Sequence, residues 1–179
     1  MASEGSRSMV DRMVRACRLD VHIFEEVEAD TLATRQALSV VVLVALATGI
    51  ASLGTTGIIG LFVGVVAAIA GWGIWAWIVY LIGTKILPTQ ATHADWGQLA
   101  RALGFAQAPG IFRVLGVIPV VGPSILLVVS IWMLVAMVVA VRQALDYTST
   151  WRAIGVVVLG FIPYVLLMYM AFVLLGAEG

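Results

Sequence analysis

The chain has 179 residues, of which 62% are hydrophobic and only 11% are charged, and its mean hydropathy is +1.08. A soluble domain of this size would carry about a quarter charged residues, so an integral membrane protein is predicted instead. The net charge is zero and Cys17 is the single cysteine, which excludes a global field for nucleic acid, an intramolecular disulfide and a metal site of several thiolates.

Residues 1–35 form a charged N-terminal segment, and no continuous apolar core of a cleavable signal peptide is expected there. Apolar residues recur at intervals of three and four, which predicts one apolar face of a helix with a break near Asp20. They are Val10, Val14, Cys17, Val21 and Phe24. Such an amphipathic helix either lies along the membrane surface or covers the protein's own loops, and the pattern favours neither.

Four acidic residues close this segment and are expected on the cytosolic surface, facing water or a partner. They are Glu25, Glu26, Glu28 and Asp30. His22 precedes Glu25 and Glu26 at the i, i+3 and i+4 spacing that can hold a divalent metal. The more frequent reading of that spacing is a solvated acidic face near Arg15 and Arg18, so no metal site is predicted.

No charged residue occurs from Gln36 to Thr84, a run that is too long for one membrane span and suits two. The stretch SLGTTG, residues 52–57, is the expected break, giving spans at about 36–53 and 58–84. In the second span, Gly57, Gly60 and Gly64 form a ridge of small residues at helical spacing. Such a ridge predicts close helix packing, either within the bundle or with a partner.

Three further spans complete the predicted fold. Asp95 and Gln98 are suited to cap a helix that begins near Trp96. The expected spans are about 102–121, from the turn at 120–124 to about 141, and 153–175. The fold class predicted is an all-α polytopic bundle of five transmembrane helices, residues 36–175, preceded by the cytosolic amphipathic segment, residues 1–35.

The third span contains the residues least typical of a membrane helix, Gln107, Pro109, Gly110 and Arg113. Proline breaks the helical hydrogen bonding, so we expect a kinked helix whose break is buried against other spans. The Gln107 amide is expected to bond either the freed carbonyl or a neighbouring helix. Arg113 lies roughly 18 Å along a helix from Arg101, and its long side chain should reach the outer interface. A transport site is the alternative interpretation.

The distribution of Lys and Arg predicts the orientation. Arg7, Arg12, Arg15, Arg18 and Arg35 lie before the first span. The connections 85–101 and 142–152 contain two basic residues each, and the other two connections and the C-terminal tail contain none. With five spans, all nine charges fall on one side, which the positive-inside rule makes cytoplasmic. We therefore expect a cytoplasmic N-terminus, an external C-terminus and residence in a cytoplasmic (inner) membrane.

Three stretches carry a family resemblance: LDVHIFEEVEADTLATRQAL at 19–38, LGFAQAPG at 103–110 and AVRQALDYTSTWRAI at 140–154. Together they resemble the bacterial branch of the Ypt-interacting-protein (YIP) domain family. That resemblance implies five spans and a cytosolic N-terminus. Eukaryotic members bind prenylated Rab-type GTPases, which bacteria lack, so no prenylated GTPase is expected as a partner of a bacterial member.

No set of residues suggests catalysis, since Ser39 and Ser130 have no neighbouring histidine and His93 has no nucleophile nearby in the sequence. We therefore predict a protein that is not an enzyme and has no cofactor. The function favoured is a scaffold or accessory subunit that contacts membrane lipid and either a membrane-protein partner or further copies of itself. The alternative is a small transporter or channel, which in five spans would require an oligomer to enclose a path.

Overall fold

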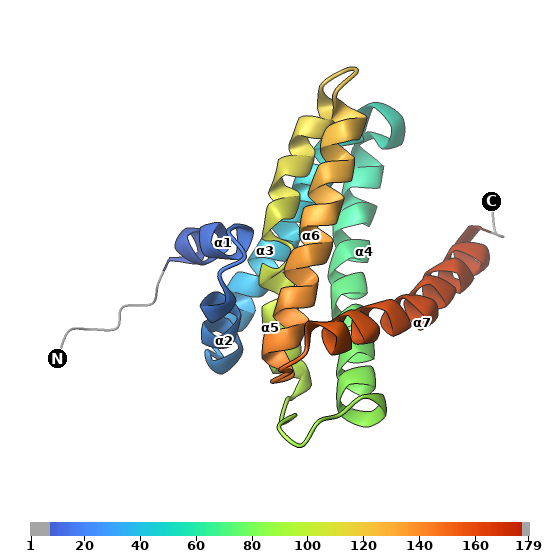
Figure 1. Cartoon of the computed structure of the whole chain (residues 1–179). Coiled ribbons are helices and arrows are strands. Elements are labelled where there is room, and N and C mark those ends of the chain that lie inside the picture. Colours follow the sequence, from blue (N-terminus) through green and yellow to red (C-terminus); the bar gives the residue numbers. More distant parts are fainter. Residues whose placement is uncertain (1–7, 177–179) are drawn as a thin grey trace.

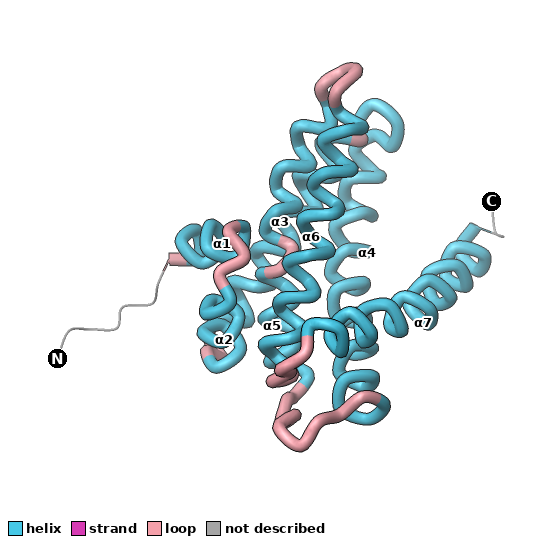
Figure 2. Tube along the Cα trace, viewed as in Figure 1, coloured by secondary structure: helices cyan, strands magenta, loops and turns pink. Residues whose placement is uncertain are grey.

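The computed structural model describes residues 8–176, so Arg7 lies outside the described residues. Within that range the chain consists of helices and contains no strand. Figure 1 shows α3, α4, α6 and the α5–η2 segment running side by side, with α1 and α2 to one side and α7 leaving the bundle at an angle. Loops join these helices, and a long one connects η1 to α5 over residues 87–95 (Figure 2).

Two short helices, α1 (Met9–Cys17) and α2 (Val21–Ala29), form the N-terminal segment. The chain divides at Leu19, which has a left-handed backbone with φ 58°, and Asp20, whose side chain caps α2 by accepting the His22 N–H. Phe24 is fully buried and Cys17 is half-buried. On α1, Val10 and Val14 of the predicted apolar face are 63% and 43% exposed, so the described chain itself does not cover them.

Four described helices are long and apolar enough to cross a membrane. They are α3 (Ala33–Ala51), α4 (Leu53–Leu81) with the π-helical turn η1 (Ile82–Ile86) continuing it, α6 (Gly122–Ala144) and α7 (Thr150–Gly176). The expected break over residues 52–57 is present, since α3 ends at Ala51 and the backbone is again non-helical at Gly57, where two helices meet at a kink within α4. Gly57, with φ 65°, separates the turn that begins at Leu53 from the continuous helix after it, which agrees with the predicted start of the second span at about residue 58.

The segment predicted as a kinked third span is not a continuous α-helix. It contains α5 (Trp96–Phe105) and a 3₁₀ helix, η2 (Ala108–Val117). The predicted start is confirmed, since Asp95 and Gln98 form a reciprocal capping box. Neither piece has the length of a membrane span, so the described chain has four such helices rather than the five predicted.

The change of helix type occurs around Pro109, which has no N–H to continue α-helical bonding. The backbone tightens instead: the Gln107 N–H donates to the Gly104 carbonyl (3.2 Å), and the Gly110 N–H donates to the Gln107 carbonyl (2.7 Å). The Gln107 side chain makes no hydrogen bond in the described chain, contrary to expectation. Pro109 and Gly110 are buried, as predicted for the break.

Close contacts at small residues hold α3 at the centre of the bundle. A side chain added at Gly110 would meet Val44 of α3 at 2.5 Å, and one added at Gly104 would meet Ala37 at 2.8 Å. Each glycine thus lets its segment approach α3 more closely than any other residue would. The α5–η2 segment is consequently fixed along α3 over most of its length, despite its irregular backbone.

The last helix, α7, crosses α4 and then leaves the bundle (Figure 1). At the crossing, the Trp75 ring lies 5.0 Å from the Phe161 ring and 5.4 Å from the Tyr164 ring. Beyond it, Val165, Leu166 and Tyr169 are 58%, 57% and 64% exposed. The second half of α7 therefore presents an apolar surface that the described chain leaves uncovered.

Candidate functional site

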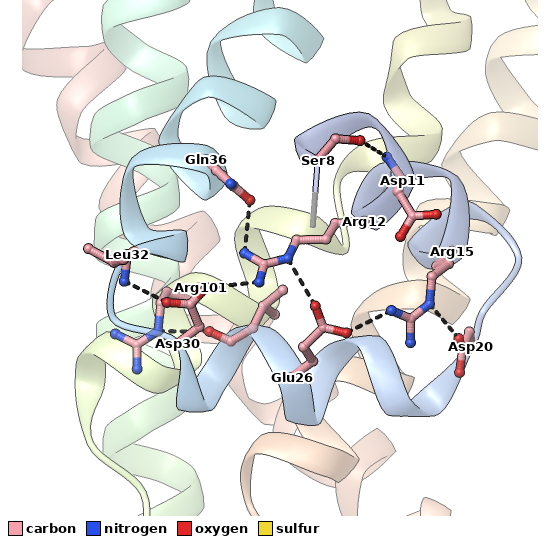
Figure 3. A network of polar contacts seen from close by, with 11 residues as sticks. Ser8, Asp11, Arg12, Arg15, Asp20, Glu26, Asp30, Leu32, Gln36 and Arg101 are labelled. Carbon is pink, nitrogen blue, oxygen red and sulfur yellow. Dashed lines mark hydrogen bonds and ion pairs between the residues drawn. The ribbon is translucent and has the colours of Figure 1, made fainter. Parts of the chain in front are cut away.

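The side chain of Arg12 joins α1, α2 and the start of α3 (Figure 3). It is only 4% exposed, and its guanidinium donates three hydrogen bonds. Nε donates to Oε1 of Glu26 (3.1 Å), Nη1 to Oε1 of Gln36 (2.9 Å) and Nη2 to Oδ2 of Asp30 (2.8 Å). A planar guanidinium can hold three acceptors in fixed directions, so this residue fixes α1 against two other helices.

Arg15 extends the same network along α1. Its Nη1 donates to the second oxygen of Glu26 (2.7 Å), and its Nε donates to Oδ2 of Asp20 (2.8 Å). The hydrogen bond from Arg15 lowers the pKa of Asp20, and the one from Arg12 lowers the pKa of Asp30. Both carboxylates therefore stay charged at neutral pH, and Glu26 is held between two arginines.

Arg101 binds the C-terminal end of α2, which Arg12 also binds through Asp30. Its side chain is 6% exposed, and its Nε donates to the carbonyls of Val27 (2.9 Å) and Glu28 (3.2 Å). Its Nη2 also bonds the Glu28 carbonyl. These carbonyls belong to the last turn of α2, where a cation satisfies unpaired acceptors and complements the helix dipole. From the sequence, Arg101 was expected only as a basic residue of a connection. The apolar residues around it in the sequence are the signal that could have indicated its burial.

The four acidic residues expected at the surface have different environments. Glu25 is exposed and accepts a hydrogen bond from Gln143 (2.7 Å), whereas Glu26 and Asp30 face Arg12. Glu28 is half-buried, and its Oε2 is buried without a hydrogen-bond partner in the described chain. Burial, aided by the negative charges of Asp146 and Glu25, raises the pKa of Glu28 to about 7. This carboxyl therefore changes charge near neutral pH.

A polar groove lies toward the opposite end of the bundle, between α3, the first half of α4, η2 and α6. Its volume is about 350 Å³, and Thr48, Ser52, Gln107 and Arg113 are among its lining residues. Arg113 donates from Nη2 to Oγ of Ser130 (3.2 Å), and its Nε is buried without an acceptor in the described chain. The structure thus places Gln107 and Arg113 in one groove with the glycine ridge. In the sequence, these two residues and the ridge were separate candidates.

The glycine ridge forms part of this same groove. Gly60 and Gly64 line it, while Gly57 supplies the left-handed residue in α4. A side chain added at Gly64 would meet nothing within 4 Å, and one added at Gly60 would meet only Thr56 of its own helix. No other described helix packs against the ridge at these two positions. That the ridge packs closely against another helix therefore stays a prediction, and that helix would belong to a partner.

The titratable residues considered for metal binding or catalysis do not assemble within residues 8–176. His22 and Glu25 are exposed, with their nearest nitrogen and oxygen 3.6 Å apart, and Glu26 faces Arg12 and Arg15 instead. No group of three His, Cys, Asp or Glu side chains among the described residues could hold a metal ion. His93 is exposed in the connection before α5. The three residues that the sequence spacing singled out together, His22, Glu25 and Glu26, thus have separate surroundings in the fold.

A family model, the Yip1 domain, matches residues 21–171. The chain belongs to the Yip1 domain family. The match begins at the first residue of α2 and runs through most of α7, so it includes the helix that Arg12 and Arg101 hold in place. Searches of curated proteins and of solved structures found no match.

Membership confirms the family resemblance and places the sites of this Yip1 protein in a membrane setting. The Yip1 domain family is a family of non-enzymatic membrane proteins, and the four apolar helices described above make this member a multi-pass membrane protein. Contact with lipid follows from the exposed apolar residues of these helices. The ion-pair network and the polar groove are thus two polar features of a lipid-embedded Yip1 domain.

Proposed function

We propose that this Yip1 protein is a non-catalytic scaffold or accessory subunit that binds a membrane-protein partner, or further copies of itself, through α4 and α7. One observation carries the proposal: only 11% of the most apolar stretch of α4 is buried within the chain, against 33% for the corresponding stretch of α3. Ile59, Phe62 and Val66 are all more than 60% exposed on this helix. An α4 so little covered by its own chain leaves room for another helix to pack.

The proposed topology has five crossings, with α5 and η2 together serving as the third. Support comes from contacts between the basic segments, which all meet at one end of the bundle. Arg101 bonds the last turn of α2, and Arg152 donates to the Pro88 carbonyl (3.1 Å) in the connection before α5. The positive-inside rule would make this end cytoplasmic, in an inner membrane, with the C-terminus outside. Residues 1–35 then form the cytosolic segment and residues 36–175 the membrane domain.

The partner is tested by photo-crosslinking in intact membranes. A photoreactive residue at Phe62, which is 66% exposed on α4, is expected to form an adduct with a second protein chain. The matched control is Leu127, which is 63% exposed on α6 and should label lipid. If both positions labelled lipid alone, the scaffold proposal would be wrong. Mass spectrometry of the adduct distinguishes a second copy from another protein.

Transport is the second candidate function, and the groove that contains Gln107 and Arg113 favours it. An ionisable residue inside a membrane protein marks a pathway by default. The purified protein in liposomes would then carry an ion or solute, and Arg113→Leu would abolish the flux while the fold survived. A scaffold carries no flux in either form, so this measurement separates the two candidates.

A further inference from the structure

The polar groove beside Arg113 has the shape and polarity of a site for an amphiphile. Its polar lining lies where α3 turns into α4 at Ser52, at the end of the bundle that also holds the connection between η2 and α6 (Figure 1). Arg113 precedes the end of η2 at Val117 by four residues, roughly 8 Å along a 3₁₀ helix. In the five-crossing topology proposed above, this places the guanidinium near the depth at which the headgroups of one leaflet meet the hydrocarbon.

The hydrogen-bond donors that line the groove are few and concentrated. The hydroxyl of Thr48 donates to the Val44 carbonyl (2.8 Å), and the hydroxyl of Thr56 donates to the Ser52 carbonyl (3.1 Å). Gln107 has no side-chain hydrogen bond, and Arg113 has one, to Ser130 (3.2 Å). The unused donors are therefore the Gln107 amide and most of the Arg113 guanidinium, including its buried Nε.

The charge of the groove is uncompensated. Its described lining contains Arg113 and no Asp or Glu. A guanidinium with free N–H groups in a partly desolvated site selects an oxyanion, and it matches a phosphate especially well because two N–H groups can meet two oxygens. The lining thus specifies the ligand's polar part as an anion of the phosphate class.

The apolar part of the groove excludes a simple aqueous anion as the best occupant. From Thr56 the lining continues through Gly60 and Gly64 to Ala68, twelve residues or roughly 18 Å along α4. Val44 and Met133 lie on the facing side. The small residues leave a channel open toward the bilayer centre, since a side chain at Gly64 would meet nothing within 4 Å. A polar head and an apolar continuation of this length match a phospholipid with one acyl chain in the channel.

We propose that this groove binds an anionic phospholipid, with Arg113 and Gln107 contacting the headgroup phosphate and an acyl chain lying over Gly60 and Gly64. The site is on the face formed by α3, η2 and the start of α4, and it stands independently of the partner proposed for the exposed face of α4. A free phosphate ion and a helix of a second copy are the alternative occupants, which the test below distinguishes from a lipid.

The test uses the full-length protein, stripped of lipid in a mild non-ionic detergent. The probes are dioleoyl-phosphatidylglycerol, dioleoylglycerol and inorganic phosphate. We expect phosphatidylglycerol to raise the melting temperature and to give a one-to-one adduct in native mass spectrometry, and we expect the other two to do neither. An equal effect of dioleoylglycerol, or an effect of inorganic phosphate alone, would overturn the proposal, because headgroup and chain would not both be required.

Two variants locate the lipid. Arg113→Gln removes the charge and should weaken phosphatidylglycerol binding about tenfold or more. Gly64→Leu fills the channel at a position with open space and should abolish the adduct while preserving the fold. The matched control is Gly54→Leu, which adds the same side chain to α4 at another open glycine outside the groove and should bind normally. Unchanged lipid binding in Gly64→Leu, or a change of oligomer size without loss of lipid, would place the lipid elsewhere and overturn the proposal.

Discussion

Arginine has opposite surroundings at the two ends of this bundle. At the end that holds α2, Arg12 and Arg101 are almost fully buried, and each has several acceptors from other helices. At the other end, Arg113 lines a groove and donates one hydrogen bond to a hydroxyl. The first environment uses the charge to hold the fold, whereas the second leaves it available to a ligand. Four predictions test this contrast.

The largest effect is expected from Arg12→Leu. The substitution leaves Glu26, Asp30 and Gln36 without their shared donor, and losing one partner of a buried ion pair costs about 3 kcal/mol. Thermal unfolding should show the loss, and limited proteolysis should show release of α1. Arg18→Leu, at an exposed position on the same segment, is the control and should change stability by less than about 0.5 kcal/mol. Equal melting temperatures would show that the network contributes nothing.

A smaller loss is expected from Arg101→Met, which keeps the apolar stem and removes the donors. The carbonyls of Val27 and Glu28 then lose charged hydrogen bonds worth about 2 kcal/mol. Amide exchange in α2 should increase in parallel with the fall in melting temperature. Lys85→Met, at an exposed position in η1, removes a charge without a burial effect and serves as the reference. Unaltered exchange in α2 would contradict the assigned role.

The third effect depends on pH and comes from Glu28. Burial raises its pKa from the ordinary value of 4.5 to about 7 in the folded chain, so the folded state binds the proton more tightly than the unfolded state does. Stability should therefore fall as the pH rises from 4.5 to about 7. Above pH 7, the ionisation of Glu28 should change the stability little further. The change is on the order of 1 kcal/mol, because the side chain is only half-buried. Glu28→Gln should flatten the melting temperature between about pH 5 and pH 8, and a slope that persists would assign the effect elsewhere.

The smallest effect on stability is expected from Arg113→Leu. The substitution removes one exposed hydrogen bond, which lowers stability, and also removes a buried Nε that has no acceptor in the described chain, which raises it. The two contributions therefore oppose each other. In lipid-free detergent, the free energy of unfolding should change by less than about 1 kcal/mol. A loss as large as that of Arg12→Leu would remove the contrast between the two ends and make Arg113 a structural residue.

Several parts of the molecule could be predicted from local sequence. The apolar runs indicated membrane helices, and four of them are present. The start of α5 followed from Asp95 and Gln98, because a capping box is made within four residues. The family followed from three short stretches and is confirmed over residues 21–171. The prediction of a continuous kinked helix for the third span was wrong. The sequence shows that Pro109 breaks the α-helical hydrogen bonding, but it does not show which hydrogen bonds replace it.

The sequence by itself thus determined that this protein lies in a membrane, where its apolar helices are and where they break. Hydropathy, caps and proline suffice for this because they act within a few residues. The tertiary structure decided the role of each charge. Arg12 reaches Gln36 across 24 positions and Arg101 reaches Val27 across 74, and neither pairing has a local signal. Gln107 and Arg113 meet the glycine ridge only because α3, α4 and η2 pack side by side. Whether a buried arginine is satisfied depends on which carbonyls and carboxylates come within 3 Å of it, and only the folded chain fixes those neighbours.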